Sequence, residues 1–283
     1  MQGLIDRLAN MDNSAPDDYE KDGIRMCGKC HTPKQKLQEF SMPCDGHYSR
    51  LVPVLCRCGK EKAHKEDLRV EREQFRCQMQ EHHDKYHITD RAYKGFTFDK
   101  DDRRNEKLSD VCLRYVEQWD EMKADNMGIL FHGSVGTGKS FYACSIVNAL
   151  LDRCVPAVVT NFPRLLNILQ NARERQEYID HLNTYQLLVI DDLGVERDSS
   201  YAAEQVFSVI DARARAELPL IVTTNLTNEE LKNPSTMQYA RIYDRVLELC
   251  PIPIKMVGES RRAGNASIRK AKAQELLMKG GLP

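Results

Sequence analysis

The sequence predicts an α/β protein in which a parallel five-stranded sheet flanked by helices follows a small cysteine-rich module and a long helix. Three observations lead to this fold class. Short apolar runs alternate with amphipathic segments over residues 91–283, as strands and helices do in parallel sheets. A glycine-rich loop at residues 133–140 follows one of these runs, and five of the ten cysteines lie from Cys27 to Cys58. We therefore expect two domains, residues 1–90 and residues 91–283.

The composition narrows the functional classes. The chain has 41 Lys and Arg against 42 Asp and Glu, so any binding of nucleic acid must be local rather than driven by an overall basic field. No apolar run approaches the roughly 18 to 20 residues that cross a bilayer, and residues 1–7 lack the apolar segment of a signal peptide. We expect a cytoplasmic protein without a membrane partner, whose cysteines are thiols or metal ligands rather than disulfides.

Two cysteine pairs predict a metal site in the first domain. Cys27 and Cys30 form a C-x-x-C knuckle, and Cys56 and Cys58 supply a second pair. Four thiolates suit a tetrahedral Zn²⁺ without an open position, which is typical of a folding site rather than a catalytic one. Three other side chains are alternatives for a member of the second pair: Cys44, His31 and His47. A thioredoxin-like redox role is disfavoured because no βαβ pattern surrounds the C-x-x-C.

Two helices are predicted between the cysteines and the glycine-rich loop. Over residues 60–87, apolar and aromatic side chains recur on one face, which either docks another protein or packs on the cysteine module. A second helix is expected over residues 105–125. Its inward side chains are predicted to be Leu108, Val111, Cys112, Tyr115, Val116 and Trp119.

The loop at residues 133–140 satisfies the pattern G-x-x-x-x-G-K-[ST] and joins a strand to a helix. Its residues are Gly133, Ser134, Val135, Gly136, Thr137, Gly138, Lys139 and Ser140. The glycines allow several backbone N–H groups to point to one place, the helix N-terminus adds partial positive charge, and Lys139 adds a full charge. We predict that this loop binds a nucleotide triphosphate and that the Ser140 hydroxyl is a ligand of Mg²⁺.

Polar side chains follow two later strands. Asp191 and Asp192 come directly after the apolar run at residues 187–190, where we expect Asp191 to hold hydrated Mg²⁺ and Asp192 to orient the attacking water. The alternative is that both acids cap the next element. Asn225 follows the strand at residues 220–222 and can hydrogen-bond the γ-phosphate or the water, although Asn also suits a turn.

The remaining segments complete the alternation of strands and helices. Strands are predicted at residues 155–160 and 252–257, and helices at residues 200–217 and 237–250. A further helix begins near Phe162. It is predicted to bury Leu165, Leu166, Ile168 and Leu169.

The order of these motifs resembles the AAA+ ATPases, and among them the bacterial and phage helicase loaders of the DnaC/DnaI type. The resemblance covers residues 93–262, with residues 133–140 as Walker A, 187–192 as Walker B and 223–225 as sensor 1. It implies an ATPase that binds ATP and Mg²⁺ and self-assembles into an oligomer. Asp192 stands where many AAA+ enzymes have Glu, which predicts slow hydrolysis.

The same resemblance implies roles for three arginines. Arg245 resembles the arginine finger that acts on ATP held by a neighbouring subunit, and Arg241 is its alternate. Arg262 lies in residues 258–262, which resemble the sensor 2 segment, usually written G-x-S-Y-R. Arg261 stands where that pattern has Tyr.

Loaders of this type grip a hexameric replicative helicase with an N-terminal module, sometimes built on zinc, and bind single-stranded DNA with the helix after the second strand. In this chain the DNA-binding region corresponds to Phe162, Arg164, Arg173 and Arg175, a basic edge with an aromatic ring to stack on a base. The resemblance thus implies an ATP-dependent helicase loader. Two other hypotheses are an IstB-type transposition helper, which binds double-stranded DNA and a transposase, and an adaptor that uses the nucleotide as a switch with little hydrolysis.

Overall fold

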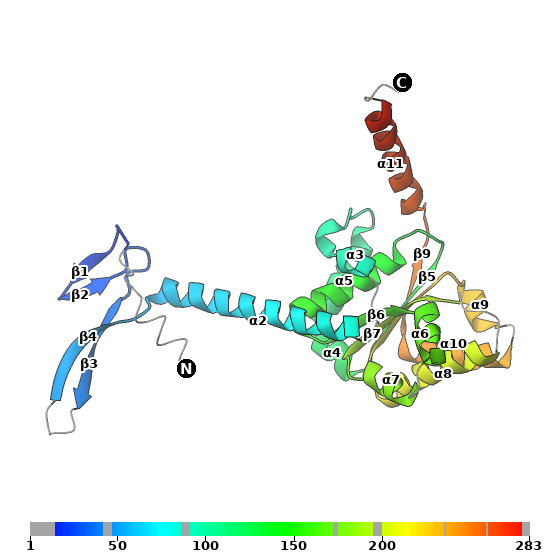
Figure 1. The fold of residues 1–283 in the computed structure, drawn as a ribbon, viewed down its shortest axis with the longest axis horizontal. Helices are drawn as coiled ribbons and strands as arrows, with labels where there is room; N and C mark the ends of the chain where they lie inside the picture. Colours follow the sequence, from blue (N-terminus) through cyan, green and yellow to red (C-terminus); the bar gives the residue numbers. More distant parts are fainter. Residues whose placement is uncertain are drawn as a thin grey trace. The chain divides into compact units, whose positions relative to one another are not determined.

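The computed structural model describes residues 15–41, 47–85, 91–171, 175–194, 200–234, 236–258 and 260–278. The chain divides into two compact units, residues 1–74 and residues 75–283 (Figure 1).

The first unit contains two antiparallel hairpins and the beginning of a long helix. Strand β1 (Tyr19–Lys21) pairs with β2 (Ile24–Met26), and β3 (Gln35–Ser41) pairs with β4 (His47–Pro53). Helix α2 (Arg57–Lys85) begins directly after Cys56. Among the described residues of this unit, the only buried apolar side chains are those of Cys27 and Cys56. Apolar burial therefore contributes little to its fold.

The second unit is built on a five-stranded parallel sheet, as predicted. The sheet contains β5 (Ile129–Gly133), β6 (Ala157–Asn161), β7 (Leu187–Leu193), β8 (Leu220–Thr224) and β9 (Ile252–Met256). The order of the strands is β6-β7-β8-β5-β9, and all neighbours are parallel. The central strands are nearly continuous apolar runs because helices cover both faces of the sheet.

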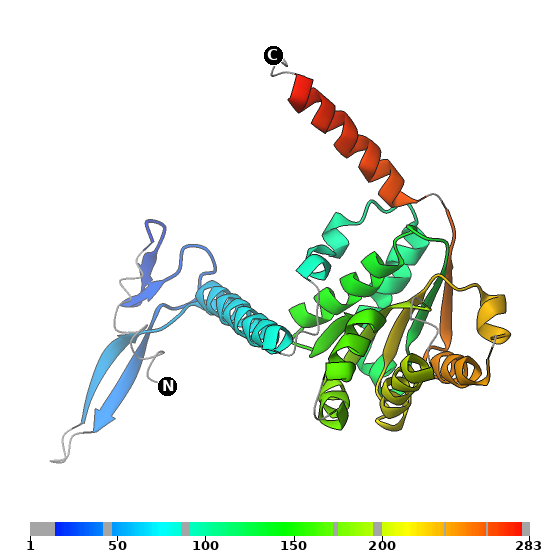
Figure 2. The same ribbon diagram turned by 45° about the vertical axis from the view of Figure 1, so that its right-hand side comes forward.

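Helices lie on both sides of this sheet (Figure 2). On one side, α3 (Glu106–Glu117), α4 (Trp119–Ala124) and α5 (Lys139–Asp152) supply an apolar cluster that includes Trp119 and Tyr142. On the other side lie α6 (Phe162–Asn171), α7 (Arg175–Leu182), α8 (Ser200–Arg215) and α10 (Met237–Leu249). The short elements are η1 (Arg91–Gly95), η2 (Phe98–Lys100) and α9 (Asn228–Lys232), and α11 (Arg261–Met278) follows β9.

The end of α2 belongs to the second unit. Met79 packs against the apolar cluster beneath α6 and α8, and Arg76 forms an ion pair with Asp152 of α5 at 2.5 Å. The His82 ring nitrogen Nδ1 lies 3.0 Å from the Tyr185 hydroxyl. The face of this helix past residue 75 is therefore covered by the sheet domain, an arrangement that differs from both predicted alternatives.

Two predictions about the helix before β5 were wrong. The expected single helix is interrupted at Gln118, which separates α3 from α4. Val111 is 41% exposed instead of inward. Ser109 takes part in the buried arc of α3 because its hydroxyl donates to Asp101 and lies 3.3 Å from the Tyr142 hydroxyl, so the arc turns away from Val111.

Among the described residues, no helix combines the length and the apolarity that a membrane crossing requires.

Candidate nucleotide and metal sites

The backbone of the loop after β5 depends on its glycines. Gly133 has φ +119°, and a Cβ built there would lie 2.3 Å from the carbonyl oxygen of Met256 on the adjacent strand β9. Gly136 has φ +79°, and a Cβ there would lie 2.2 Å from Ser260 Oγ. Any side chain at these two positions would strain the backbone and push the loop away from its neighbours.

Lys139 is the first residue of α5, and its side chain folds back into this loop. The residue is only 5% exposed, and its Nζ donates to the carbonyl oxygens of Gly133 at 2.9 Å and Ser134 at 2.7 Å. Ser140 follows on the first turn of the helix. A cation, a helix N-terminus and a turn with two positive-φ glycines (Gly136 and Gly138) converge here, which is an arrangement suited to phosphate groups.

The first acid of the predicted pair is held by hydroxyl groups on both sides. Asp191 is 3% exposed. Its Oδ1 accepts a hydrogen bond from Thr223 Oγ1 at 2.5 Å, and its Oδ2 accepts one from Tyr93 Oη at 3.0 Å. A buried carboxylate with a fixed orientation is suited to act as a ligand of a hydrated cation.

The second acid, Asp192, lies at an irregularity in the sheet. The pairing of β7 with β8 shifts between Ile190 and Leu193, and Asp192 has φ +60°. Its backbone N–H donates to Thr223 Oγ1 at 3.0 Å. The bulge lets two successive acids differ in environment, since Asp191 is buried and Asp192 is partly exposed.

Asn225 and the phosphate loop lie at the same edge of the sheet. His132, just before the loop, is the register partner of Thr224, and Asn225 directly follows Thr224. The Asn225 residue is exposed. The sheet thus brings together the loop, the acid pair and Asn225 at the carboxyl ends of β5, β7 and β8, where ligands collect in open α/β sheets.

The segment after β9 also reaches the loop. The backbone N–H of Arg261 donates to the carbonyl oxygen of Gly136 at 2.9 Å, and its guanidinium lies 3.2 Å from an oxygen of Asp102. A cleft beside the loop is lined by Arg104, Asn105, Leu108, Thr137, Met256, Val257, Gly258 and Arg261. The sequence pattern selected Arg262, whose side chain lies outside the described residues, whereas it is Arg261 that contacts the loop.

The two predicted finger arginines lie on α10, against α8 of the same subunit. Arg245 is paired with Glu248 at 2.5 Å and with Asp211 at 3.4 Å. The Arg241 guanidinium lies over the ring of Phe207, 4.5 Å from its centroid. Within one subunit, these contacts of Arg241 and Arg245 are thus with residues of α8 and α10 and not with the phosphate loop.

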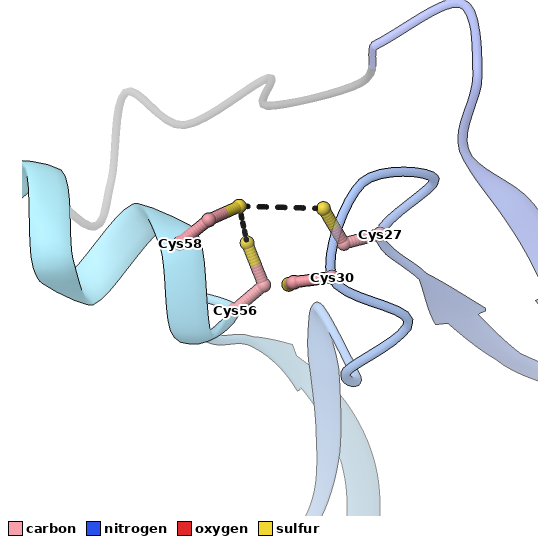
Figure 3. Close-up of side chains that lie close together, drawn as sticks. All are labelled: Cys27, Cys30, Cys56 and Cys58. Carbon is pink, nitrogen blue, oxygen red and sulfur yellow. Dashed lines mark hydrogen bonds between the residues drawn. The ribbon is translucent and has the colours of Figure 1, made fainter.

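In the first unit, the four predicted cysteines form one cluster (Figure 3). Their sulfur atoms all lie within 4.8 Å of one another, with Cys58 Sγ 3.6 Å from Cys27 Sγ and 3.4 Å from Cys56 Sγ. Tetrahedral zinc with bonds of about 2.3 Å needs sulfur atoms about 3.8 Å apart. The spacing of the four sulfur atoms is therefore compatible with this ion.

The alternative ligands lie elsewhere or are not described. His31 Nδ1 is 3.3 Å from the Tyr19 hydroxyl, and His47 Nδ1 is 3.2 Å from Ser41 Oγ. Cys44 lies outside the described residues.

Comparison with known proteins complements this geometry. Residues 47–268, well over half of the chain, match the family described as IstB-like ATP binding protein. The chain belongs to this family. Its five-stranded α/β unit also has the AAA+ fold, as in the crystal structure of DnaI, which superimposes on it with a TM-score of 0.50 and 24% identity and covers 61% of this chain and 94% of that one. A putative primosome component from Streptococcus pyogenes serotype M3 superimposes with a TM-score of 0.51 and 25% identity, covering 61% of this chain and 92% of that one.

Curated relatives of this IstB-like chain include helicase loaders. The replicative helicase loader DnaI of Bacillus subtilis is 29% identical over 148 residues, which are 48% of this chain and 47% of DnaI. The loader DnaC of Escherichia coli K12 is 27% identical over 138 residues, or 47% of this chain and 54% of DnaC. The chain thus spans about half the length of these relatives.

A relative from a mobile element is also similar. The putative ATP-binding protein of insertion sequence IS232 from Bacillus thuringiensis is 28% identical over 177 residues, covering 59% of this chain and 65% of that protein.

The electrostatics of the cysteine cluster are compatible with a bound cation. The backbone N–H of Cys58 and the Thr32 hydroxyl lower the pKa of Cys30 to about 5, and backbone N–H groups of the knuckle lower the pKa of Cys27. The neighbouring sulfurs of Cys56 and Cys27 raise the pKa of Cys58 to about 12. Crowded thiolates repel one another, and a divalent ion at their centre removes that repulsion.

A partly buried ion pair supports the knuckle of this IstB-like protein. Lys34 Nζ bonds to Asp18 Oδ2, and Asp18 Oδ1 accepts the Gly28 N–H at 3.2 Å. The bond to Lys34, together with the Ala15 N–H, lowers the pKa of Asp18 to about 2. Asp18 therefore stays ionised at neutral pH and fixes the turn between the first two cysteines.

The predicted DNA-binding edge needs a correction. Phe162 is fully buried in the apolar cluster under α6, so its ring cannot stack on a base. The Asn161 side chain accepts the Arg164 N–H at 2.9 Å, which starts α6 with Phe162 facing the sheet. Arg164 is partly buried and Arg175 is exposed, while Arg173 lies outside the described residues.

Sequence reasoning missed two residues with defined roles in the structure. Tyr93 reaches Asp191 from a position 98 residues earlier in the chain. Arg213 is fully buried and donates to the carbonyl oxygens of Tyr185, Gln186 and Pro219. Burial lowers the pKa of the Arg213 guanidinium. No local pattern signals either contact, because both join segments that are distant in sequence.

Proposed function

We propose that this protein is an ATP-dependent loader of a replicative DNA helicase onto single-stranded DNA. The observation that carries the proposal is the similarity of about half of the chain to the helicase loaders DnaI and DnaC. The AAA+ fold and the convergence of the phosphate loop, Asp191 and Asn225 at one sheet edge support it.

In this proposal each residue at the carboxyl edge of the sheet has its own role in ATP binding or hydrolysis. Lys139 and the loop N–H groups bind the β- and γ-phosphates, and Ser140 and Asp191 hold Mg²⁺, which neutralises charge on the phosphate oxygens when bound. Asp192 and Asn225 orient the attacking water. Arg261, which already touches Gly136, is a better placed candidate than Arg262 for contact with the phosphates.

The site is proposed to be completed by a second copy of the chain. Arg245, with Arg241 as its alternate, would stabilise the charge on the phosphoryl group held by the neighbouring subunit. Arg245 is now paired with Glu248 and Asp211, so assembly must exchange these carboxylates for phosphate oxygens. Hydrolysis is therefore expected to depend on self-assembly and to be slow in the isolated subunit.

The N-terminal region is proposed to bind the partner helicase and to take no part in ATP hydrolysis. Zn²⁺ on Cys27, Cys30, Cys56 and Cys58 would hold its fold, and the region up to about residue 90 would bind the hexameric helicase. For single-stranded DNA, the remaining candidates are Arg164, Arg173 and Arg175, which would contact phosphates without base stacking by Phe162.

Co-purification of the full chain with the cognate replicative helicase tests this function. We expect a complex that forms with wild-type protein and ATP. Lys139→Ala should abolish ATP binding without unfolding the chain, because the lysine serves the ligand rather than the core; the exposed Lys232→Ala is the matched control. The absence of any complex, with or without ATP, would sink the proposal.

A transposition helper ATPase is the second candidate, favoured by the family match and by the similarity to the IS232 protein. Such a protein should bind double-stranded DNA and a transposase instead of a helicase. To distinguish a nucleotide-switched adaptor from these two ATPases, ATP turnover is measured for the protein alone and with single-stranded DNA. Tight ATP retention without stimulation by DNA indicates the switch.

A further inference from the structure

The carboxylate of Asp191 has a hydrogen-bond donor that belongs to none of the nucleotide motifs. Tyr93 lies on η1, before α3, and its Oη is 3.0 Å from Asp191 Oδ2. On the other oxygen, Thr223 Oγ1 donates at 2.5 Å. Each oxygen of this buried carboxylate therefore accepts one hydroxyl and keeps further lone pairs for other partners.

Tyr93 is itself held by one contact to its phenol and one to its backbone. Asn161 Nδ2 lies 3.5 Å from Tyr93 Oη, and Asn161 is the register partner of Asp191 in the sheet. From α5, the helix that begins with Lys139, Asn148 Nδ2 donates to the carbonyl oxygens of Tyr93 at 3.0 Å and Phe96 at 2.8 Å. The tyrosine is thus anchored to the helix of the phosphate loop and to the strands of the acid pair.

The contacts of the phenol define it as a donor to the carboxylate. A carboxylate oxygen can only accept, so the Tyr93 hydroxyl donates to Asp191. The amide of Asn161, which can donate to the phenol oxygen, favours a proton that points toward the carboxylate. Donors of this kind orient ligating carboxylates, and their removal typically costs about 10- to 100-fold in metal affinity.

We propose that Tyr93 is a positioning residue that orients the Asp191 carboxylate toward Mg²⁺ at the nucleotide site. The inference rests on the proposed ATP and Mg²⁺ site, and adds to it a residue from outside the motifs. It predicts that loss of the hydroxyl changes how nucleotide binding depends on Mg²⁺ and leaves binding without Mg²⁺ unchanged. A tyrosine that only fills space would affect both kinds of binding equally or neither.

The test compares Tyr93→Phe with Tyr115→Phe in the full-length protein. Tyr115 is a matched control because its buried hydroxyl donates to the Met127 carbonyl oxygen at 2.8 Å, in the apolar cluster on the same side of the sheet. Binding of a fluorescent ATP analogue is titrated at a series of Mg²⁺ concentrations and in EDTA. For Tyr93→Phe we expect the Mg²⁺ concentration at half-saturation to rise about tenfold or more, with unchanged affinity in EDTA. Tyr115→Phe should match wild type.

Thermal unfolding checks that the variants are folded, and Asn148→Ala gives a second route. Asn148→Ala keeps the Tyr93 side chain but removes the hydrogen bonds that anchor the backbone of η1. It should therefore raise the Mg²⁺ concentration at half-saturation less than Tyr93→Phe does. An unchanged Mg²⁺ dependence in Tyr93→Phe overturns this inference alone. If wild-type protein shows no Mg²⁺-dependent nucleotide binding, the proposed function fails, and the inference fails with it.

Discussion

The described residues 15–41 and 47–74 bury no apolar side chains other than Cys27 and Cys56, whereas the sheet of the second unit carries apolar clusters on both faces. In the ribbon of β3 and β4, even Leu37 is 63% exposed. The first unit is centred on a cluster of four cysteine sulfur atoms, whereas the second has a hydrophobic core. The two units should therefore respond to different perturbations, since the fold of one depends on the proposed metal and that of the other on apolar packing.

The largest expected effect is the loss of the metal. The double variant Cys27→Ser, Cys30→Ser should lose about one zinc per chain and the hairpins of the first unit, because the part of this unit that the structure describes buries no apolar side chains besides Cys27 and Cys56 that could replace the ion. Elemental analysis and circular dichroism measure these losses. Unfolding of the second unit, followed by the buried Trp119, should be unchanged.

The control for this experiment is Cys77→Ser, because Cys77 is exposed and outside the cluster. It should retain the metal. Zinc that survives in the double variant would refute the ligand set of Cys27, Cys30, Cys56 and Cys58.

A smaller effect, confined to the second unit, is expected from Arg213→Met. The change removes the guanidinium that donates to the carbonyl oxygens of Tyr185, Gln186 and Pro219 in a buried environment. We expect the free energy of unfolding of the second unit to fall by about 3 kcal/mol or more. Denaturant unfolding followed by Trp119 fluorescence measures this change, while the zinc content should stay constant.

The neighbouring Arg215→Met provides the comparison for that variant. Arg215 is exposed and forms a surface ion pair with Asp211 at 3.0 Å, so its removal should cost less than about 1 kcal/mol. Equal effects of the two variants would contradict a structural role of the buried guanidinium.

The smallest effect is expected from Asp18→Asn, which weakens the support of the knuckle without touching a sulfur. The pKa of Asp18 is lowered to about 2, so the lost charge matters at neutral pH, where the carboxylate holds Lys34 and the Gly28 N–H. We expect release of zinc to a chelator to become faster, by about tenfold at most. Glu20→Gln, on the exposed strand β1, should release zinc at the wild-type rate.

In both units, the sequence predicted the features that depend on local patterns. In the second unit, the strands and the phosphate loop were predictable because parallel strands covered on both faces are apolar throughout, and because the loop pattern is local. The cysteine pairs likewise predicted a cluster in the first unit from spacing alone. These features depend on residues that are close in the chain.

Predictions failed where distant segments decide the outcome. Val111 is on the edge of the apolar arc of α3, and only the contacts of Ser109 with Asp101 and Tyr142 turn that arc away from it. Phe162 was predicted to contact DNA because the resemblance to helicase loaders assigns that role to the helix after the second strand, but the first turn of α6 directs this ring into the core. Tyr93 and Arg213 could not be found in advance, since their partners are fixed by tertiary packing.

The contact between Arg261 and Gly136 has a mechanical consequence. Arg261 is the first residue of α11, and its N–H is bonded to the carbonyl oxygen in the middle of the phosphate loop. A rotation of this 18-residue helix about its first turn must either carry Gly136 with it or break that bond. The position of the first turn of α11 and the backbone conformation of the loop around Lys139 are therefore coupled through this one hydrogen bond.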